Sequence, residues 1–160
     1  MVSDLAQRAW DAAATVVDPE IPALTVADLG ILRDVVVHDG RADVEITPTY
    51  SGCPAMNMIG VEIELALARA GIDGRVRTVL SPAWTTDWMT EEGRRKLTES
   101  GIAPPQRGGG RRALFGADSV ACPICASEDT EKLAEFGSTS CKSLWRCRAC
   151  REPFDHFKCH

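Results

Sequence analysis

Apolar and polar residues alternate along two neighbouring stretches in the first third of the chain. Leu32 to His38 contains three consecutive valines, and Arg41 to Thr47 alternates apolar residues with charged ones. A period of two predicts half-buried β-strands in both stretches. The pair Asp39-Gly40 between them is a strong signal for a two-residue hairpin turn. A third strand is expected at Arg75 to Leu80.

Three other stretches have helical spacing: Ser3 to Val16, Ala55 to Ala70 and Thr90 to Leu97. The middle helix is expected to bury one apolar face, broadened by a second row of residues. The first row is Met56, Ile59, Ile63, Leu67 and Ala70, and the second is Val61, Leu65 and Ala68. The order α-β-β-α-β-α predicts an α+β fold, a small two-layer α/β domain with helices packed on a mixed sheet.

The composition changes after the third helix and predicts a second domain. Residues 104–112 begin with two prolines and continue with three glycines and several arginines, which is typical of a linker. We therefore expect a first domain at 1–103, a linker at 104–113, and a β-rich zinc-ribbon-like metal-binding domain at 114–160.

Charge and hydropathy exclude some classes of protein. The net charge of −5 and the pI of about 5.2 disfavour a general nucleic-acid binder, which needs a basic surface. No apolar run approaches the roughly 20 residues of a membrane span. The first ten residues carry Asp4 and Arg8 and lack the apolar region of a secretory signal, so a cytoplasmic location without membrane attachment is expected.

Cys53 lies where the second strand leads into the second helix, between Gly52 and Pro54. Proline is favoured at the first helical position, which would put Cys53 at or near the N-cap. The positive end of the helix dipole would then lower the pKa of the thiol. The alternative is a small buried core residue, whose pKa burial would raise.

Six of the seven cysteines fall in the last forty residues. Two Cys-x-x-Cys pairs, separated by 21 residues, predict two knuckles that share one tetrahedral metal ion. The predicted ligands are Cys122, Cys125, Cys147 and Cys150. A domain of this size has little core of its own, and Phe136, Trp145, Phe154 and Phe157 are expected to supply it.

Four further residues are surplus to a site with four ligands: Cys141, His156, Cys159 and His160. They are candidates for additional ligands, since thiolate and imidazole groups both bind transition metals. Alternatively, these residues are redox-active, or they belong to a disordered chain end that has no role.

Several motifs of the first domain resemble those of the SufT-like family of iron–sulfur assembly factors: Asp18-Pro-Glu-Ile-Pro22, Asp28-Leu-Gly30, Ile46-Thr-Pro48, Gly52-Cys-Pro54 and Ser81-Pro-Ala-Trp84. Two motifs of the tail narrow the resemblance to the family's accessory proteins of the phenylacetyl-CoA epoxidase system: Phe136-Gly-Ser-Thr-Ser-Cys-Lys142 and Pro153-Phe-Asp-His-Phe-Lys158.

This resemblance implies a role in assembling or inserting an iron–sulfur cluster during aerobic phenylacetate catabolism. It implies a reactive thiol at Cys53 that holds a transient cluster. The implied client is the flavin and 2Fe–2S reductase subunit of the epoxidase, which performs ring 1,2-epoxidation. The tail could hold zinc or iron, because tetra-thiolate sites bind either. A cluster normally takes four protein ligands, so a homodimer that pairs two Cys53 thiolates is one expectation.

A non-catalytic metal-handling factor is therefore favoured over three other functions. The first is a direct redox or structural subunit of the monooxygenase complex. The second is a thiol oxidoreductase, which the lack of a resolving cysteine near Cys53 disfavours. The third is a nucleic-acid-binding ribbon, which the acidic balance disfavours.

Overall fold

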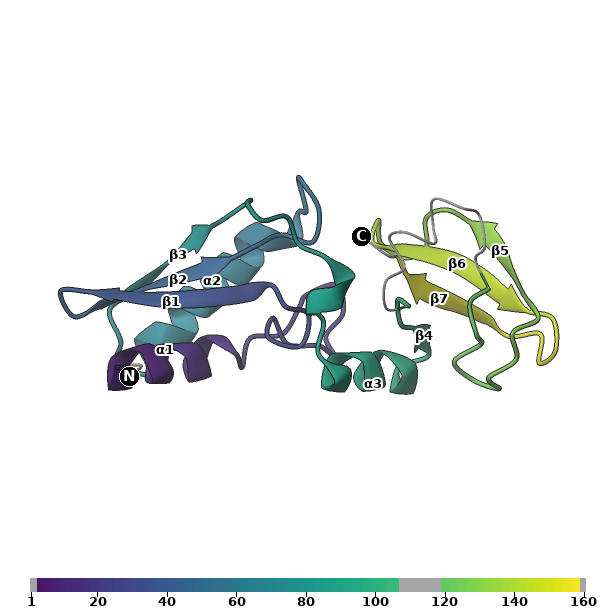
Figure 1. Ribbon diagram of the computed structural model, residues 1–160, viewed down its shortest axis with the longest axis horizontal. Coiled ribbons are helices and arrows are strands. Elements are labelled where there is room, and N and C mark those ends of the chain that lie inside the picture. The colour runs from purple at the N-terminus through teal and green to yellow at the C-terminus, as the bar shows by residue number, and fades with distance from the viewer. Residues whose placement is uncertain (1–2, 107–118, 159–160) are drawn as a thin grey trace. The chain divides into compact units, whose positions relative to one another are not determined.

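The structure is a computed structural model that describes residues 3–106 and 119–158. The chain divides into two compact units (Figure 1). The first unit comprises Met1–Trp84 and Trp88–Thr90, and the second comprises Thr85–Asp87 and Glu91–His160. The helices in the described part of the chain are all too short or too polar to cross a membrane.

The first unit has an α+β fold with one three-stranded sheet. Its elements are α1 (Asp4–Ala13), β1 (Leu32–His38), β2 (Arg41–Ile46), α2 (Ala55–Arg69) and β3 (Gly74–Thr78). β2 lies in the centre, antiparallel to β1 and parallel to β3, so the sheet is mixed as predicted. The β1–β2 turn is the predicted one, and both Asp39 and Gly40 have positive φ angles.

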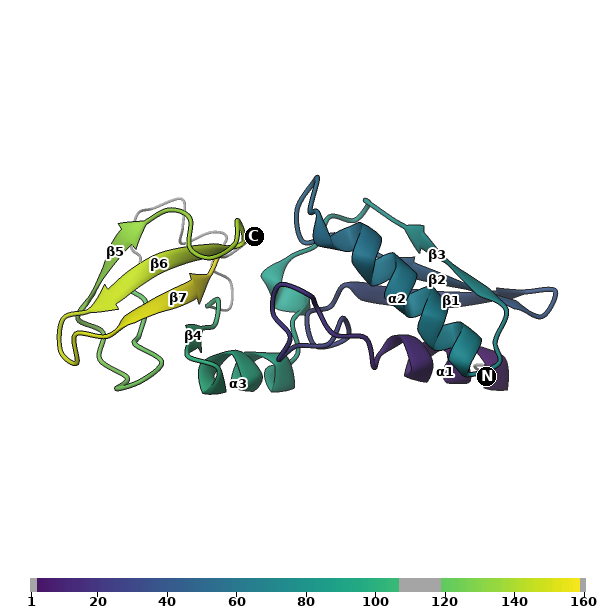
Figure 2. The same cartoon turned by 180° about the vertical axis from the view of Figure 1, so that it is seen from behind.

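The two faces of this sheet differ in chemistry. On β2, Ala42, Val44 and Ile46 are almost fully buried. Both α1 and α2 contact the sheet and each other, so they cover the same face, as Figure 2 shows from the helix side. The other face carries ion pairs between β2 and β3, in which Arg75 bonds Asp43 and Arg77 bonds Glu45. These exposed pairs each contribute little to stability.

Two helices differ from their predicted extents or faces. The first helix ends at Ala13 instead of Val16, because Val17 leaves it to form a β-bridge with Thr25. On α2, the second apolar row was wrongly assigned to the core: Val61 is 54% exposed and Leu65 is 43% exposed. The core face of α2 is the narrower row Ala55, Ile59, Ile63 and Leu67.

The second unit contains α3 (Glu91–Glu99) and a four-stranded sheet in the order β4-β7-β6-β5. The strands are β4 (Ile102–Ala103), β5 (Thr130–Ala134), β6 (Lys142–Cys147) and β7 (Pro153–Phe157). Trp145, Phe154 and Phe157 are buried as expected, but Phe136 is 66% exposed and was wrongly assigned to the core. It follows β5 in a loop, where the Lys158 ammonium lies over its ring at 4.0 Å.

The second unit begins before the expected boundary at residue 103. β4 joins its sheet by parallel pairing with β7, which places Ile102 opposite Asp155. The guanidinium of Arg94 on α3 donates to the carbonyls of Thr86 and Pro105. These bonds tie α3 and β4 to the second unit. Residues 107–113 of the predicted linker lie outside the described residues.

Candidate functional site

Cys53 lies on the connection from β2 to α2, at the edge of the sheet where the parallel strands β2 and β3 end. α2 begins at Ala55 with Pro54 as its cap, so Cys53 lies directly before the N-cap, near the predicted position. Its N–H donates to the Tyr50 carbonyl at 3.3 Å, and its carbonyl accepts from the Met56 N–H at 3.3 Å. Gly52, with φ of +79°, makes the turn that precedes it.

The environment of the half-buried Cys53 thiol raises its pKa, contrary to the expected lowering. Burial is the largest cause, because a thiolate loses solvation there. The Ala55 N–H and the Tyr50 side chain bond to the sulfur and lower the pKa, while the charges of Glu20 and Asp18 raise it. The helix-terminus effect therefore exists but is outweighed, and Cys53 is a neutral thiol at neutral pH.

The Asp18-Pro-Glu-Ile-Pro22 motif near the thiol also has a structural role. The Asp18 carboxylate accepts from the N–H groups of Glu20 at 2.7 Å and Ile21 at 2.9 Å. This is the turn and cap chemistry that the sequence favours for such a residue. The Asp18 carboxylate thus holds the turn, and Asp18 and Glu20 both place negative charge near Cys53, where a metal cation would be attracted.

Two other motifs of the first unit pack together. The Trp84 indole N–H donates to the Leu29 carbonyl at 2.8 Å. Gly30 has φ of +75°, and a Cβ on it would lie 2.5 Å from the Trp88 carbonyl oxygen. The Asp28-Leu-Gly30 and Ser81-Pro-Ala-Trp84 motifs are therefore packed against each other in the first unit.

The four predicted tail ligands form a second site. Their sulfur atoms all lie within 4.8 Å of one another. The Cys122 and Cys150 sulfurs are 3.7 Å apart, and those of Cys125 and Cys147 are 3.5 Å apart. A tetrahedral ion with metal–sulfur bonds of about 2.3 Å needs sulfurs about 3.8 Å apart. The four thiols therefore fit one tetrahedral metal ion.

The two knuckles have matching backbone geometry. The residue after each second cysteine, Ala126 and Arg151, has a positive φ angle, of 62° and 68°. In each knuckle a backbone N–H points at the first sulfur, from Ile124 to Cys122 at 3.4 Å and from Cys150 to Cys147 at 3.5 Å. Such N–H groups stabilise thiolates, as a metal ligand requires.

Within this cluster the pKa values of Cys147 and Cys150 shift in opposite directions. The Cys150 N–H is the main cause that lowers the pKa of Cys147 to about 7. The Glu152 N–H is the largest single influence on the pKa of Cys150 and lowers it. Burial and the three neighbouring thiols together outweigh this effect and raise the pKa to about 12. Four adjacent thiolates repel each other unless a cation neutralises them, so the donor set requires a metal to ionise fully.

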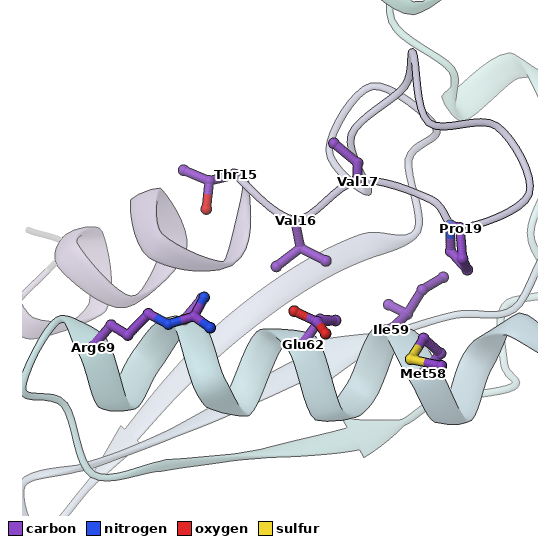
Figure 3. A pocket seen from close by; sticks show the side chains of 9 residues that line it. Thr15, Val16, Val17, Pro19, Met58, Ile59, Glu62 and Arg69 are labelled. Carbon is purple, nitrogen blue, oxygen red and sulfur yellow. The ribbon is translucent and has the colours of Figure 1, made fainter.

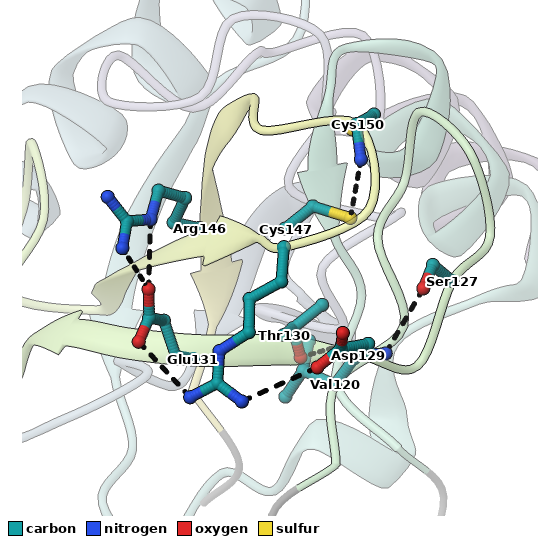
Figure 4. A network of polar contacts seen from close by, with 9 residues as sticks. Val120, Ser127, Asp129, Thr130, Glu131, Arg146, Cys147 and Cys150 are labelled. Atoms are coloured by element: carbon teal, nitrogen blue, oxygen red, sulfur yellow. Dashed lines mark hydrogen bonds and ion pairs between the residues drawn. The ribbon is translucent and has the colours of Figure 1, made fainter.

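A network of charges fixes the second knuckle to β5 (Figure 4). The Glu131 carboxylate binds both Arg146 and Arg148, which flank Cys147 in the sequence. Arg148 also reaches Asp129 at 3.5 Å. These arginines lower the pKa of Glu131, so the carboxylate stays charged. Sequence reasoning missed this network, because it pairs residues that are 15 to 19 positions apart.

Of the surplus candidates, the two that the structure describes, Cys141 and His156, lie outside the four-sulfur cluster. The Cys141 thiol is buried and contacts the Thr139 hydroxyl at 3.0 Å. His156 is buried with its ring edge-on to Trp145, at 5.9 Å between centroids. Cys159 and His160 lie outside the described residues. A role of these four residues as additional ligands stays a prediction.

Comparisons with known proteins match both units of the chain. Residues 6–81 match the family described as iron–sulfur cluster assembly protein. Residues 107–158 match the family described as PaaD zinc β-ribbon domain. Both matches agree with the resemblance that the motifs indicate.

Individual relatives extend these matches. The chain is 46% identical over 151 residues to a protein of Escherichia coli (strain K12) that is provisionally named as a subunit of a 1,2-phenylacetyl-CoA epoxidase, covering 94% of this chain and 90% of the relative. It is 37% identical over 81 residues to an Fe-S protein maturation auxiliary factor of Porphyromonas gingivalis, covering 49% of this chain and 76% of that protein. A solved Bacillus anthracis domain of unknown function, DUF59, shares the fold, with a TM-score of 0.54 at 23% identity over 58% of this chain and 91% of that one.

Proposed function

Because the chain belongs to the family of iron–sulfur cluster assembly proteins that carry a PaaD zinc β-ribbon, we propose that it is an accessory factor that matures an iron–sulfur client of a phenylacetyl-CoA epoxidase system. The observation that carries the proposal is the half-buried Cys53 thiol at the strand edge of an assembly-type domain. The cluster is cargo that passes through the protein.

In this proposal Cys53 supplies one ligand to a transient cluster. Its proton leaves for solvent as the sulfur binds iron, and the Ala55 N–H, which bonds the sulfur, stabilises the thiolate that results. Asp18 and Glu20 add negative charge that attracts iron. A cluster takes four protein ligands. The others come from the client or from a second copy of this chain, and ligands shared with the client would let the cluster move on.

The tail has a structural part in this proposal. Cys122, Cys125, Cys147 and Cys150 would hold zinc, which has no redox chemistry and fixes the fold of a small domain. The ribbon would then contribute to recognition of the client. The client would be the reductase subunit of the epoxidase, which carries a flavin and a 2Fe–2S cluster.

The second candidate function is a direct subunit of the monooxygenase complex, which the name of the Escherichia coli relative favours. In that case the tail would hold iron. Quantifying zinc, iron and sulfide in anaerobically purified protein separates the two, since zinc cannot transfer electrons. One zinc per chain supports the maturation role, whereas stoichiometric iron and sulfide in the tail would favour the redox role.

The test of the maturation role is the variant Cys53→Ser. A serine hydroxyl can accept the same bond from the Ala55 N–H at this half-buried position, so we expect a loss of stability below about 1 kcal/mol. Cluster content of the reductase subunit should nevertheless fall to background in cells that carry this variant. The measurement combines thermal melting with iron and sulfide analysis of the client. A stable variant that matures its client fully would remove Cys53 from the mechanism.

A further inference from the structure

Helix α2 presents an exposed row of three large apolar residues to solvent, on the side away from its buried row. Met58 is 55% exposed, Val61 is 54% exposed and Leu65 is 43% exposed. Spacings of three and four residues place them on one face of the helix. Three large apolar side chains in a row on one helix face are typical of a surface that binds another protein.

A groove of about 410 Å³ runs beside this row, between α2 and the segment after α1 (Figure 3). Val16 and Ile59, both buried, form its base, and Val17 and Met58 are exposed at its sides. The full lining is Thr15, Val16, Val17, Pro19, Met58, Ile59, Glu62, Ala66 and Arg69.

The groove also carries two opposite charges, Glu62 and Arg69, and apart from Thr15 the rest of its lining is apolar. Figure 3 shows the Glu62 carboxylate and the Arg69 guanidinium extending from α2 toward the 15–17 segment. Within the residues that the structure describes, neither group forms an ion pair. A protein that occupies the groove can therefore gain affinity and register from a base near Glu62 and an acid near Arg69.

The groove is continuous with the surroundings of Cys53. Pro19 lines one end of it, and the residues on either side of Pro19, Asp18 and Glu20, act electrostatically on the Cys53 thiol. Met58 is three residues after Ala55, where α2 begins, which is about 4.5 Å along the helix axis at 1.5 Å per residue. A specific interface covers about 800 Å² of each partner. A client that contacts Cys53 over such an area also reaches Met58.

We infer that this groove and the exposed row Met58, Val61 and Leu65 beside it form the docking site for the iron–sulfur client, and that the occupant is an amphipathic helix of the client. The apolar face of that helix packs on Met58, Val61 and Leu65, with a basic residue near Glu62 and an acidic one near Arg69. This is the helix-in-groove mode of recognition. The inference rests on the proposed function and adds to it the surface that brings the client's cysteines to Cys53.

The test measures binding of the full chain to the apo-reductase subunit of the epoxidase by titration calorimetry. The double variant Met58→Glu/Leu65→Glu should weaken binding at least tenfold, because two charges would enter an apolar contact. Gln7→Glu/Thr98→Glu adds the same two charges at exposed positions outside α2 and the groove, and it should bind like the wild type. Met58→Ala/Leu65→Ala should weaken binding less, and it replaces the double Glu variant if that one melts early.

The outcomes distinguish this inference from the proposed function. Cys53→Ser should bind the client normally but transfer no cluster, whereas the groove variants should accept a cluster in reconstitution but fail to dock. Groove variants that bind as tightly as the wild type would overturn the inference and leave the proposed function intact. A wild-type dimer in sedimentation that the groove variants dissociate, with unchanged client affinity, would also overturn it. Wild-type protein that docks but never loads a cluster would overturn the proposed function alone.

Discussion

At the scale of single residues, the pKa of Cys53 is decided by several neighbours that act in opposite directions. Burial and the charges of Glu20 and Asp18 raise it, whereas the Ala55 N–H lowers it. A thiol with a raised pKa is mostly protonated at pH 7, so it reacts slowly with electrophiles and oxidants. Such a thiol is protected until a metal displaces its proton, which suits a carrier of clusters.

This pKa shift makes a prediction for alkylation. The rate of iodoacetamide labelling of Cys53 should rise with pH and reach its midpoint above the pKa of about 8.5 of an ordinary cysteine. Glu20→Gln removes a negative charge, which makes the thiolate easier to form. The pKa should fall and labelling at pH 7 should become a few times faster. Peptide-resolved mass spectrometry measures this, and a midpoint below about 8 in the wild type would contradict it.

At the scale of elements, the packing of Gly30 against Trp88 is a critical contact of the first unit. Gly30→Ala would combine a strained positive φ with a Cβ only 2.5 Å from the Trp88 carbonyl oxygen. We expect a loss of more than about 2 kcal/mol in the free energy of unfolding. Gly40→Ala is the matched control, because Gly40 has φ of +78° but no atom within 4 Å of an added Cβ. It should lose only about 1 kcal/mol, and equal losses in urea denaturation would contradict the packing argument.

The ribbon is the element whose fold should depend on metal. Removing the metal with a chelator should release one zinc per chain and unfold β5, β6 and β7, because binding and folding are coupled in such modules. The helices α1 and α2 should remain, as judged by far-ultraviolet circular dichroism. Hydrogen exchange resolves the two units in one experiment, and a ribbon that stays protected without metal would contradict the prediction.

Two cysteine variants test which thiols hold this metal. Cys122→Ser should lower metal content and destabilise the ribbon, since it removes one of four clustered sulfurs. Cys141→Ser should retain one metal ion per chain, because its thiol contacts Thr139 and lies outside that cluster. Metal loss in the Cys141 variant would show that the site has other ligands.

At the scale of the whole molecule, the pairing of β4 with β7 changes what a cut in residues 106–112 should do. The composition of that segment predicts cleavage that releases two folded pieces. However, Ala103 is buried among Trp145, Phe154 and other residues of the ribbon core. We therefore expect trypsin to give two fragments on a denaturing gel that elute together in native gel filtration. Fragments that elute separately would mean that β4 contributes little.

The sequence predicted the elements of this protein well, because local rules decide them. The valines of β1, the turn at Asp39-Gly40 and the buried row of α2 follow from periodicity and turn chemistry. The two Cys-x-x-Cys motifs likewise predicted that their four sulfur atoms lie together. Each motif is a local turn, and two such turns complete the ligand set of one shared ion.

Only the tertiary structure decided which surfaces those elements bury. Periodicity finds an apolar face but does not say how much of it another element covers, and so Val61 and Leu65 are exposed on α2. The same reason applies to the pKa of Cys53, which depends on the packing of a distant acidic turn against the helix end. Burial and long-range charge are properties of the assembled chain, whereas helices, strands, turns and metal knuckles are properties of the local sequence.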